Sequence, residues 1–164
     1  MLRSRQGYGV VVTSLVPVDE LTSVVEQATI AAVIEARTAI EVQSAYLAAE
    51  RRTAQDLHDL RIALADRERS LDEPELLLRH DAEVHRGVVV AAHNDILLEL
   101  FDMLAPRVES AMRTILSIGA VPPSRPDHLQ HVAVVDAIAA GDRDLARDLT
   151  LQHLALLKSL VREG

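Results

Sequence analysis

The sequence predicts an all-α protein, an antiparallel bundle of six to seven helices that encloses a metal and ligand pocket. Apolar residues make up 49% of the chain but aromatic residues only 2%, so the core is built from Leu, Val, Ile and Ala, which favours packed helices over a sandwich or barrel. Apolar positions recur at helical spacing in long segments, and the segments between them are short and contain capping residues. Short connections are typical of antiparallel bundles, and 164 residues suffice for one such domain.

Composition also restricts the function. The net charge of −8 argues against the main body as a nucleic-acid binder, because such domains are usually basic. Cysteine is absent, which leaves only nitrogen and oxygen atoms as metal ligands. No apolar run approaches 18 residues and the N-terminus lacks a signal-peptide pattern, so a cytoplasmic protein without membrane contact is expected.

Residues 1–14 differ from the rest of the chain. They contain two arginines and two glycines that signal a turn, followed by the β-branched run Val10–Thr13. The segment is predicted to be the second half of a β-hairpin whose partner strand is barely present. Because an isolated hairpin is only marginally stable in water, the segment looks like the end of a part that is cut away. The helical domain is expected to span residues 17–164.

The first helical pattern covers residues 19–50 and is expected to form two helices with a break near residues 29–32. Thr53 and Asp56 then form a capping-box pattern, which starts a helix that runs to about residue 70. The helix before this cap has an inward stripe that contains one arginine: Val33, Arg37, Ile40, Ser44 and Leu47.

Four further helices are expected: from Asp72–Glu75 to near His93, from 95 to about 117, from Ser124 to Ala140, and from 143 to about 162. Asn94 is placed to cap the second of these. Gly141 and Asp142 suit the end of one helix and the start of the next. Prolines and a glycine within residues 119–126 predict a loop.

The helix near residue 81 carries the first candidate ligands. Asp81 and His85 fall inside an apolar stripe that includes Leu77, Val84 and Val88. Residues at i and i+4 lie one turn apart on one face. A carboxylate that faces a core is costly unless it is paired or bound to a cation, so the pair points to a metal site.

Two more histidines interrupt apolar stripes in the last two helices. His131 precedes the turn at Gly141–Asp142 by about ten residues, and His153 follows it by about eleven. At ~1.5 Å per residue both lie roughly 16 Å from the turn, level with each other across the hairpin. We therefore predict one metal site made of Asp81, His85, His131 and His153.

Three imidazoles and one carboxylate suit zinc, nickel, manganese, iron or cobalt, and zinc is the first choice on ligand type and availability. The alternative for each histidine is a hydrogen-bonded core residue, and for Asp81 a buried ion pair with Arg37. His128 lies one turn from His131 and is the one plausible substitute ligand. The other histidines are expected at the surface, at helix ends or off the stripe: His58, His80 and His93.

Short motifs spread over residues 17–162 also resemble a known family. They are Glu35-Ala36-Arg37-x-x-Ile40-Glu41, Asp81-x-x-x-His85, Ala91-Ala92-His93-Asn94, His131-x-x-Val134-x-x-Ala137-Ile138-x-x-Gly141-Asp142 and His153-Leu154. Together they resemble the C-terminal effector-binding (FCD) domain of GntR-type transcription regulators of the FadR/VanR kind. Residues 5–12 look like the wing of the winged helix-turn-helix that precedes this domain, without the three helices that read DNA. The chain therefore looks like a truncated regulator or a standalone sensor domain.

The resemblance implies a role in transcription regulation. By it, the four predicted ligands match the family's metal ligands one by one, and the metal helps to hold a small carboxylate effector. Effector binding is then expected to alter how a homodimer grips DNA through the missing N-terminal domain. Two positions depart from the family pattern, because Val84 stands where phenylalanine is usual and His93 where glycine is usual.

Arg37 and Asn94 are the candidate effector-binding residues. Arg37 lies on the inward stripe, and a guanidinium binds a carboxylate bidentately. Its alternative is an i,i+4 pair with Glu41 on a surface. The alternative for Asn94 is a helix cap.

Three functions compete, of which the sensor is preferred. The second is a metalloenzyme, such as a hydrolase that uses metal-bound water, and it requires a general base beside an open coordination position. Glu83 is the nearest acidic candidate, but two residues from both ligands it points away from them, so no enzyme is expected. The third is a structural bundle in which the metal only stabilises the fold.

Overall fold

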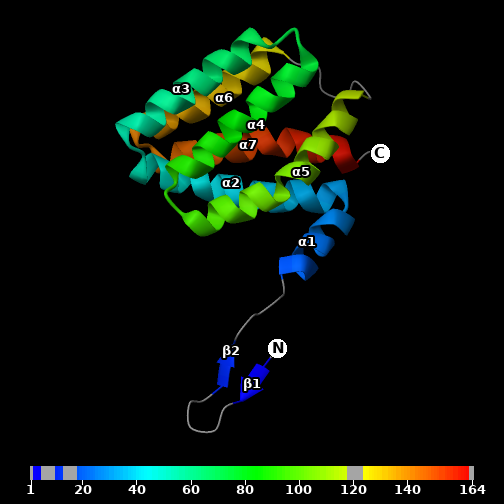
Figure 1. Cartoon of the computed structure of the whole chain (residues 1–164). Helices are drawn as coiled ribbons and strands as arrows, with labels where there is room; N and C mark the ends of the chain where they lie inside the picture. The colour runs from blue at the N-terminus through cyan, green and yellow to red at the C-terminus, as the bar shows by residue number, and fades with distance from the viewer. Residues whose placement is uncertain (1, 5–9, 13–17, 118–123, 163–164) are drawn as a thin grey trace.

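The computed structural model describes residues 2–4, 10–12, 18–117 and 124–162. Within these residues seven helices pack into one bundle, preceded by a short hairpin, which confirms the all-α prediction (Figure 1). The helices are α1 (Val18–Gln27), α2 (Ile30–Arg51), α3 (Ala54–Arg69), α4 (Pro74–Ala91), α5 (Asp95–Ser117), α6 (Arg125–Ala140) and α7 (Arg143–Arg162). None of these helices combines the length and apolar character that crossing a membrane requires.

Local side-chain caps begin the helices close to the predicted boundaries. Thr29 accepts a hydrogen bond from a main-chain N–H of the first turn of α2, which confirms the predicted break between the first two helices. Thr53 and Asp56 form the reciprocal capping box at the start of α3. Helix α4 starts within the predicted range Asp72–Glu75, but Glu73 occupies the N-cap position without a side-chain capping bond. Pro74 tolerates that start, since it has no N–H to satisfy.

The turn between α6 and α7 brings these two helices side by side. Gly141 ends α6 in the left-handed region, with φ 77°, which glycine adopts without steric cost. Asp142 then caps α7, and its Oδ1 accepts from the N–H of Leu145 at 3.0 Å. The tight turn sets the register of α6 against α7 and therefore the relative height of their buried histidines.

Helix α2 lies at the centre of the bundle and packs against α4, α5, α6 and α7. Its core positions Ala45, Ala48 and Ala49 are buried, and such small side chains let neighbouring helices approach closely. The main apolar core also includes Leu60 and Ile138. The predicted stripe of α2 is partly wrong, because its two long apolar residues, Ile40 and Leu47, are only half-buried.

Two short strands precede the helices. β1 (Leu2–Ser4) pairs with β2 (Val10–Val12) in antiparallel register, with Leu2 opposite Val12. The predicted turn at residues 5–9 lies outside the described residues, as do residues 13–17 and most of the loop expected at 119–126.

Candidate metal centre

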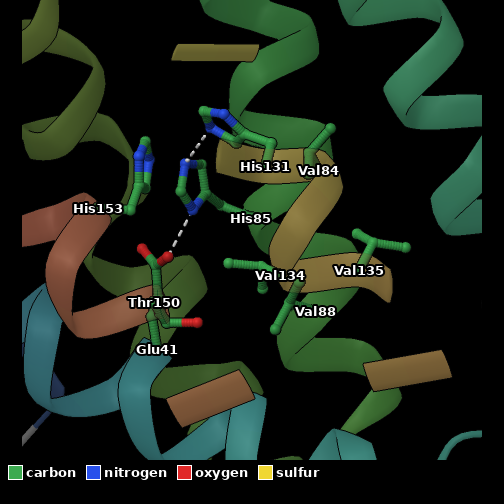
Figure 2. A pocket seen from close by; sticks show the side chains of 9 residues that line it. All are labelled: Glu41, Val84, His85, Val88, His131, Val134, Val135, Thr150 and His153. Carbon is green, nitrogen blue, oxygen red and sulfur yellow. Dashed lines mark hydrogen bonds and ion pairs between the residues drawn. The ribbon is translucent and has the colours of Figure 1, made fainter. Parts of the chain in front are cut away.

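Three histidines from three helices meet inside the bundle. His85 of α4, His131 of α6 and His153 of α7 each offer a ring nitrogen, and these atoms lie within 4.8 Å of one another. The residues are only 3–7% exposed. Figure 2 shows the three rings facing one another above Glu41 of α2. The rings of His131 and His153 meet edge to face, with their centroids 4.2 Å apart. The structure thus brings together all three histidines of the predicted site.

Hydrogen bonds at Nδ1 determine which nitrogen of His85 and His131 is free. The Nδ1 of His131 lies 3.0 Å from the main-chain oxygen of Asp127, and because a carbonyl only accepts, this nitrogen carries the proton. The Nδ1 of His85 lies 2.5 Å from Oε2 of Glu41. Burial raises the pKa of Glu41, but Arg37 and His85 outweigh it and lower the pKa to about 2, so the ionised carboxylate accepts from His85. In its neutral form, each ring therefore presents a lone pair at Nε2.

These two lone pairs point at each other. The Nε2 atoms of His85 and His131 are 3.2 Å apart, so two neutral rings bring their lone pairs together and repel unless a proton or a metal cation lies between them. A proton is disfavoured at His85, because burial lowers its pKa. A neutral imidazole whose other nitrogen is bonded to an oxygen acceptor is the usual form of a metal-binding histidine. The donor set fits a metal ion.

His153 follows the same pattern. Its Nδ1 lies 3.0 Å from Oε1 of Gln130, which leaves Nε2 free. Burial lowers the pKa of His153 to about 2, so this ring also stays neutral at physiological pH. The third imidazole is thus available as a ligand.

Asp81 contacts two of the three histidines. Its Oδ1 is 3.1 Å from Nε2 of His131, and its Oδ2 is 3.6 Å from Nε2 of His85. Burial raises the pKa of Asp81, but His85, His131 and Arg67 together hold it well below its usual range, so the carboxylate is ionised. The ion pair considered with Arg37 does not form, since Nε of Arg67 takes that place at 2.8 Å.

The two candidate effector residues occupy different environments. Arg37 is 2% exposed and pairs with Glu41, so the i,i+4 pair considered as the alternative exists, but it is buried rather than on a surface. Asn94 caps α5, where its Oδ1 accepts from the N–H groups of the first turn at 3.2 Å. Within the described part of the chain, Asn94 is outside the linings of the two inner cavities.

The remaining histidines lie outside the cluster. His128 is buried, but its Nδ1 faces Nη1 of Arg67 at 3.4 Å and not the other rings. His80 contacts Ser70, His93 contacts Asp56 on the surface, and His58 is exposed. The acidic candidate Glu83 is exposed, as expected for a side chain that points away from the ligands.

The sequence reasoning missed four residues that contact the predicted ligands: Glu41, Arg67, Asp127 and Gln130. Arg67 carried a usable signal, because it continues the buried stripe of Leu60 and Leu64 at helical spacing, as Asp81 does in α4. The sequence pattern predicts Glu41 only as a surface partner of Arg37, whereas both side chains are buried on one face of α2.

Two small cavities flank these polar residues. The first, of about 20 Å³, is enclosed by the histidines, Glu41 and apolar side chains such as Val84 and Val88, and has room for about one water molecule. The second, of about 90 Å³, lies between α2, α4 and α5, and Arg37 and Asp81 are in its wall. The i,i+4 pairs Arg37–Glu41 and Asp81–His85 therefore each reach from one cavity to the other.

Comparisons with known proteins agree with this architecture. The family described as the FCD domain matches residues 32–156, and the chain belongs to this family, the effector-binding domain of GntR-type regulators. The chain is similar to the "Putative L-lactate dehydrogenase operon regulatory protein" of Escherichia coli (strain K12) and of Shigella flexneri, with 32% identity over 135 residues in each case. That region covers 79% of this chain and 50% of each relative, so the chain spans about half the length of the curated relatives it matches. These relatives are regulators and not enzymes, in agreement with the prediction.

Solved structures share the fold. Escherichia coli McbR/YncC has a TM-score of 0.69 at 17% identity, with 99% of this chain and 77% of that chain covered. Streptococcus agalactiae GntR has a TM-score of 0.64 at 20% identity, covering 96% and 74%. A GntR-family transcriptional regulator from Pseudomonas syringae pv. tomato str. DC3000 also has 0.64 at 20%, covering 99% and 63%.

Proposed function

We propose that this domain senses a small organic acid with the help of a bound divalent metal, and so controls DNA binding by a full-length homodimeric regulator. Asp81, His85, His131 and His153 are the proposed ligands. Zinc is the first choice on ligand type, and nickel, manganese, iron and cobalt are compatible with the same set. DNA contact is assigned to the N-terminal domain of such regulators, whose wing the β1–β2 hairpin resembles.

One observation carries the proposal: two buried histidines whose Nδ1 atoms are both committed to oxygen acceptors face each other through Nε2 at 3.2 Å. Between two neutral rings this arrangement is repulsive, and a shared proton or a metal cation relieves the repulsion. With a divalent metal bound, the same nitrogens become ligands, and the metal supplies a positively charged centre to which a carboxylate oxygen can bind.

The charge of the site favours an anionic effector. Arg37 offsets Glu41, and Arg67 offsets one of the two carboxylates Asp81 and Asp127. With neutral histidines, a divalent cation leaves the site with about one net positive charge, which an acid anion neutralises. The 90 Å³ cavity beside Arg37 and Asp81 limits that anion to a small molecule.

The names of the relatives fit this class of effector. The Escherichia coli relative is named as a regulator of an L-lactate dehydrogenase operon, and lactate is a small hydroxy acid. We assign Arg37 to the effector carboxylate, because it lies with Asp81 in the wall of the 90 Å³ cavity. We leave Asn94 to its capping role, because its side-chain oxygen already accepts two main-chain hydrogen bonds.

Metal content tests the site directly. The purified protein is expected to hold about one divalent ion per chain, and His85→Ala, His131→Ala and His153→Ala are expected to lose most of it in elemental analysis. His80→Ala is the matched control, since His80 precedes Asp81 on α4 but contacts Ser70. Full occupancy in His131→Ala would rule out the ligand assignment.

Thermal shift with a panel of small hydroxy acids and dicarboxylates tests sensing. At least one acid should raise the melting temperature of the metal-loaded protein, as mass action requires, and the gain should vanish after chelation and shrink in Arg37→Lys. Equal stabilisation of the metal-free form would mean that the metal is only structural. Turnover of a small ester or amide would instead favour the hydrolase alternative.

A further inference from the structure

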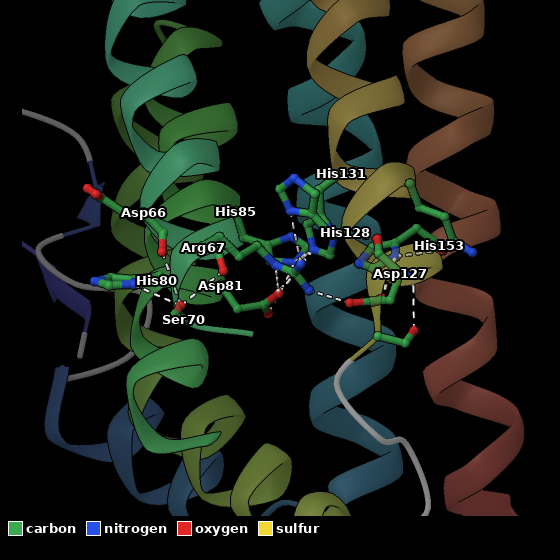
Figure 3. A network of polar contacts seen from close by, with 12 residues as sticks. Asp66, Arg67, Ser70, His80, Asp81, His85, Asp127, His128, His131 and His153 are labelled. Atoms are coloured by element: carbon green, nitrogen blue, oxygen red, sulfur yellow. Dashed lines mark hydrogen bonds and ion pairs between the residues drawn. The ribbon is translucent and has the colours of Figure 1, made fainter. Parts of the chain in front are cut away.

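Arg67 is a buried cation that joins three helices behind the metal ligands. It lies on α3 and is 2% exposed, although it carries one of the largest side chains in the core. Its Nε donates to Oδ1 of Asp81 on α4 at 2.8 Å, and its Nη2 donates to Oδ2 of Asp127 on α6 (Figure 3). Its Nη1 lies 3.4 Å from Nδ1 of His128, also on α6.

Stability alone does not account for such a residue. Taking a guanidinium out of water is costly, and well-packed apolar residues of similar volume often replace a buried ion pair without loss of stability. One arginine also leaves two carboxylates only half neutralised. Both of its carboxylate partners, however, contact the histidine cluster.

The first connection runs through Asp81. Hydrogen bonding by Arg67 holds one oxygen of this carboxylate, and the same oxygen lies 3.1 Å from Nε2 of His131. The other oxygen faces Nε2 of His85 at 3.6 Å. Arg67 therefore restricts the rotation of the one acidic ligand and keeps it turned toward the two imidazoles.

The second connection runs through Asp127. Its main-chain oxygen accepts the proton of His131 Nδ1 at 3.0 Å, which orients that ring. Its side chain is held by Arg67, and its Oδ1 lies 3.9 Å from Nδ1 of His153. By holding the first turn of α6 against α3, Arg67 holds the carbonyl that orients His131.

We propose that Arg67 is a positioning residue for the metal site, which orients Asp81 directly and His131 through Asp127. The inference rests on the proposed metal site and names a determinant of its affinity and geometry that lies outside the ligand set. Lysine cannot replace it, because an ammonium lacks the planar fork that reaches two carboxylates in fixed directions.

Cobalt(II) binding is the test, because its visible absorption reports the arrangement of the ligands. Arg67→Lys should bind Co²⁺ about ten- to a hundredfold more weakly than the unaltered protein, the usual cost of losing a group that orients metal ligands, and its absorption bands should shift. The matched control is Arg86→Lys. Arg86 follows His85 on α4, but its side chain is half exposed and makes two 2.8 Å hydrogen bonds to Asp102 of α5. Its variant should keep both affinity and spectrum.

Asp127→Asn provides a second, milder change. It keeps Arg67 and the main-chain oxygen but removes the charge that Arg67 holds, so a smaller loss of affinity with a similar spectral shift is expected. If Arg67→Lys does not fold, as judged by circular dichroism of the metal-free form, Asp127→Asn decides the question. Unaltered affinity and spectrum in the folded variants would overturn the inference. Failure of the unaltered protein to bind Co²⁺ would instead overturn the proposed metal site itself.

Discussion

Two buried residues of α6, Ile138 and His131, lie seven positions apart but contact different kinds of groups. Ile138 is 0% exposed and lies in the apolar core beside Ala45 and Ala137, where it contributes by removing hydrocarbon from water. His131 is 3% exposed and contacts His85, Asp81 and a main-chain oxygen. The comparison separates two roles: the apolar residues packed with Ile138 (the apolar half) stabilise the fold, and the polar residues around His131 (the polar half) form the proposed metal site.

The energetic reasons for this division are general. Burying a large aliphatic side chain contributes about 1.5–3 kcal/mol to folding. Burying charged side chains contributes much less to folding, because the cost of removing them from water roughly offsets their mutual attraction. The polar half is therefore expected to add little to the stability of the metal-free protein, although it contains the proposed metal ligands.

The largest effect is expected for Ile138→Ala, which leaves a cavity in the apolar half. Its cost is about 2–5 kcal/mol of the free energy of unfolding. Denaturant unfolding of the metal-free protein measures this loss, and titration of the folded variant should give a metal affinity close to that of the unaltered protein. A large loss of metal affinity would show that the two halves are coupled and would contradict the separation of their roles.

The second prediction concerns how the stability of the metal-free protein depends on pH, which is set by histidines of the polar half. Burial lowers the pKa of His85, His128 and His153 in the folded protein. Below about pH 6.5 the unfolded chain therefore takes up protons that the folded chain does not, so the metal-free protein should lose stability as the pH falls from 7 toward 5. His128→Gln removes one of these groups and should reduce the slope by up to about 1.4 kcal/mol per pH unit.

Denaturant unfolding after chelation, repeated between pH 8 and pH 5, measures that slope. The control is His58→Gln, which makes the same substitution at an exposed histidine on α3. Stability of the metal-free protein that is flat over this range would mean that the histidines are not buried as neutral groups.

The proposed metal ligands and the residues that contact them also differ in how well the sequence alone predicts them. His131 and His153 interrupt apolar stripes at matched distances from the turn at Gly141, which is local information. The roles of Glu41 and Arg67 depend on partners 44 and 60 residues away, which no local pattern specifies. Helix caps such as Thr53 were predictable for the same reason as the histidines, because cap and helix are adjacent in the chain.

The last prediction concerns His93, which lies just beyond the C-terminal end of α4. His93 follows that helix with φ 47°, the left-handed region in which a side chain is strained. The glycine that is usual at this position in the resembling family adopts it freely. The imidazole Nε2 lies 2.8 Å from Asp56, a partly exposed contact of small value.

His93→Gly should therefore raise the free energy of unfolding slightly, by about 0.5–1 kcal/mol, since relief of about 1–2 kcal/mol of strain exceeds the lost contact and the added freedom of the unfolded chain. His93→Ala keeps the strain and loses the contact, so it should be slightly less stable than the unaltered protein. Melting temperatures of the two variants should differ in sign of change, by about 2–4 °C per kcal/mol. Metal affinity should stay the same in both variants, because position 93 lies beyond the end of α4, about two helical turns after His85. A gain in stability with alanine as large as with glycine would mean that φ is not the cause, and a change in affinity would mean that the helix end and the site are linked.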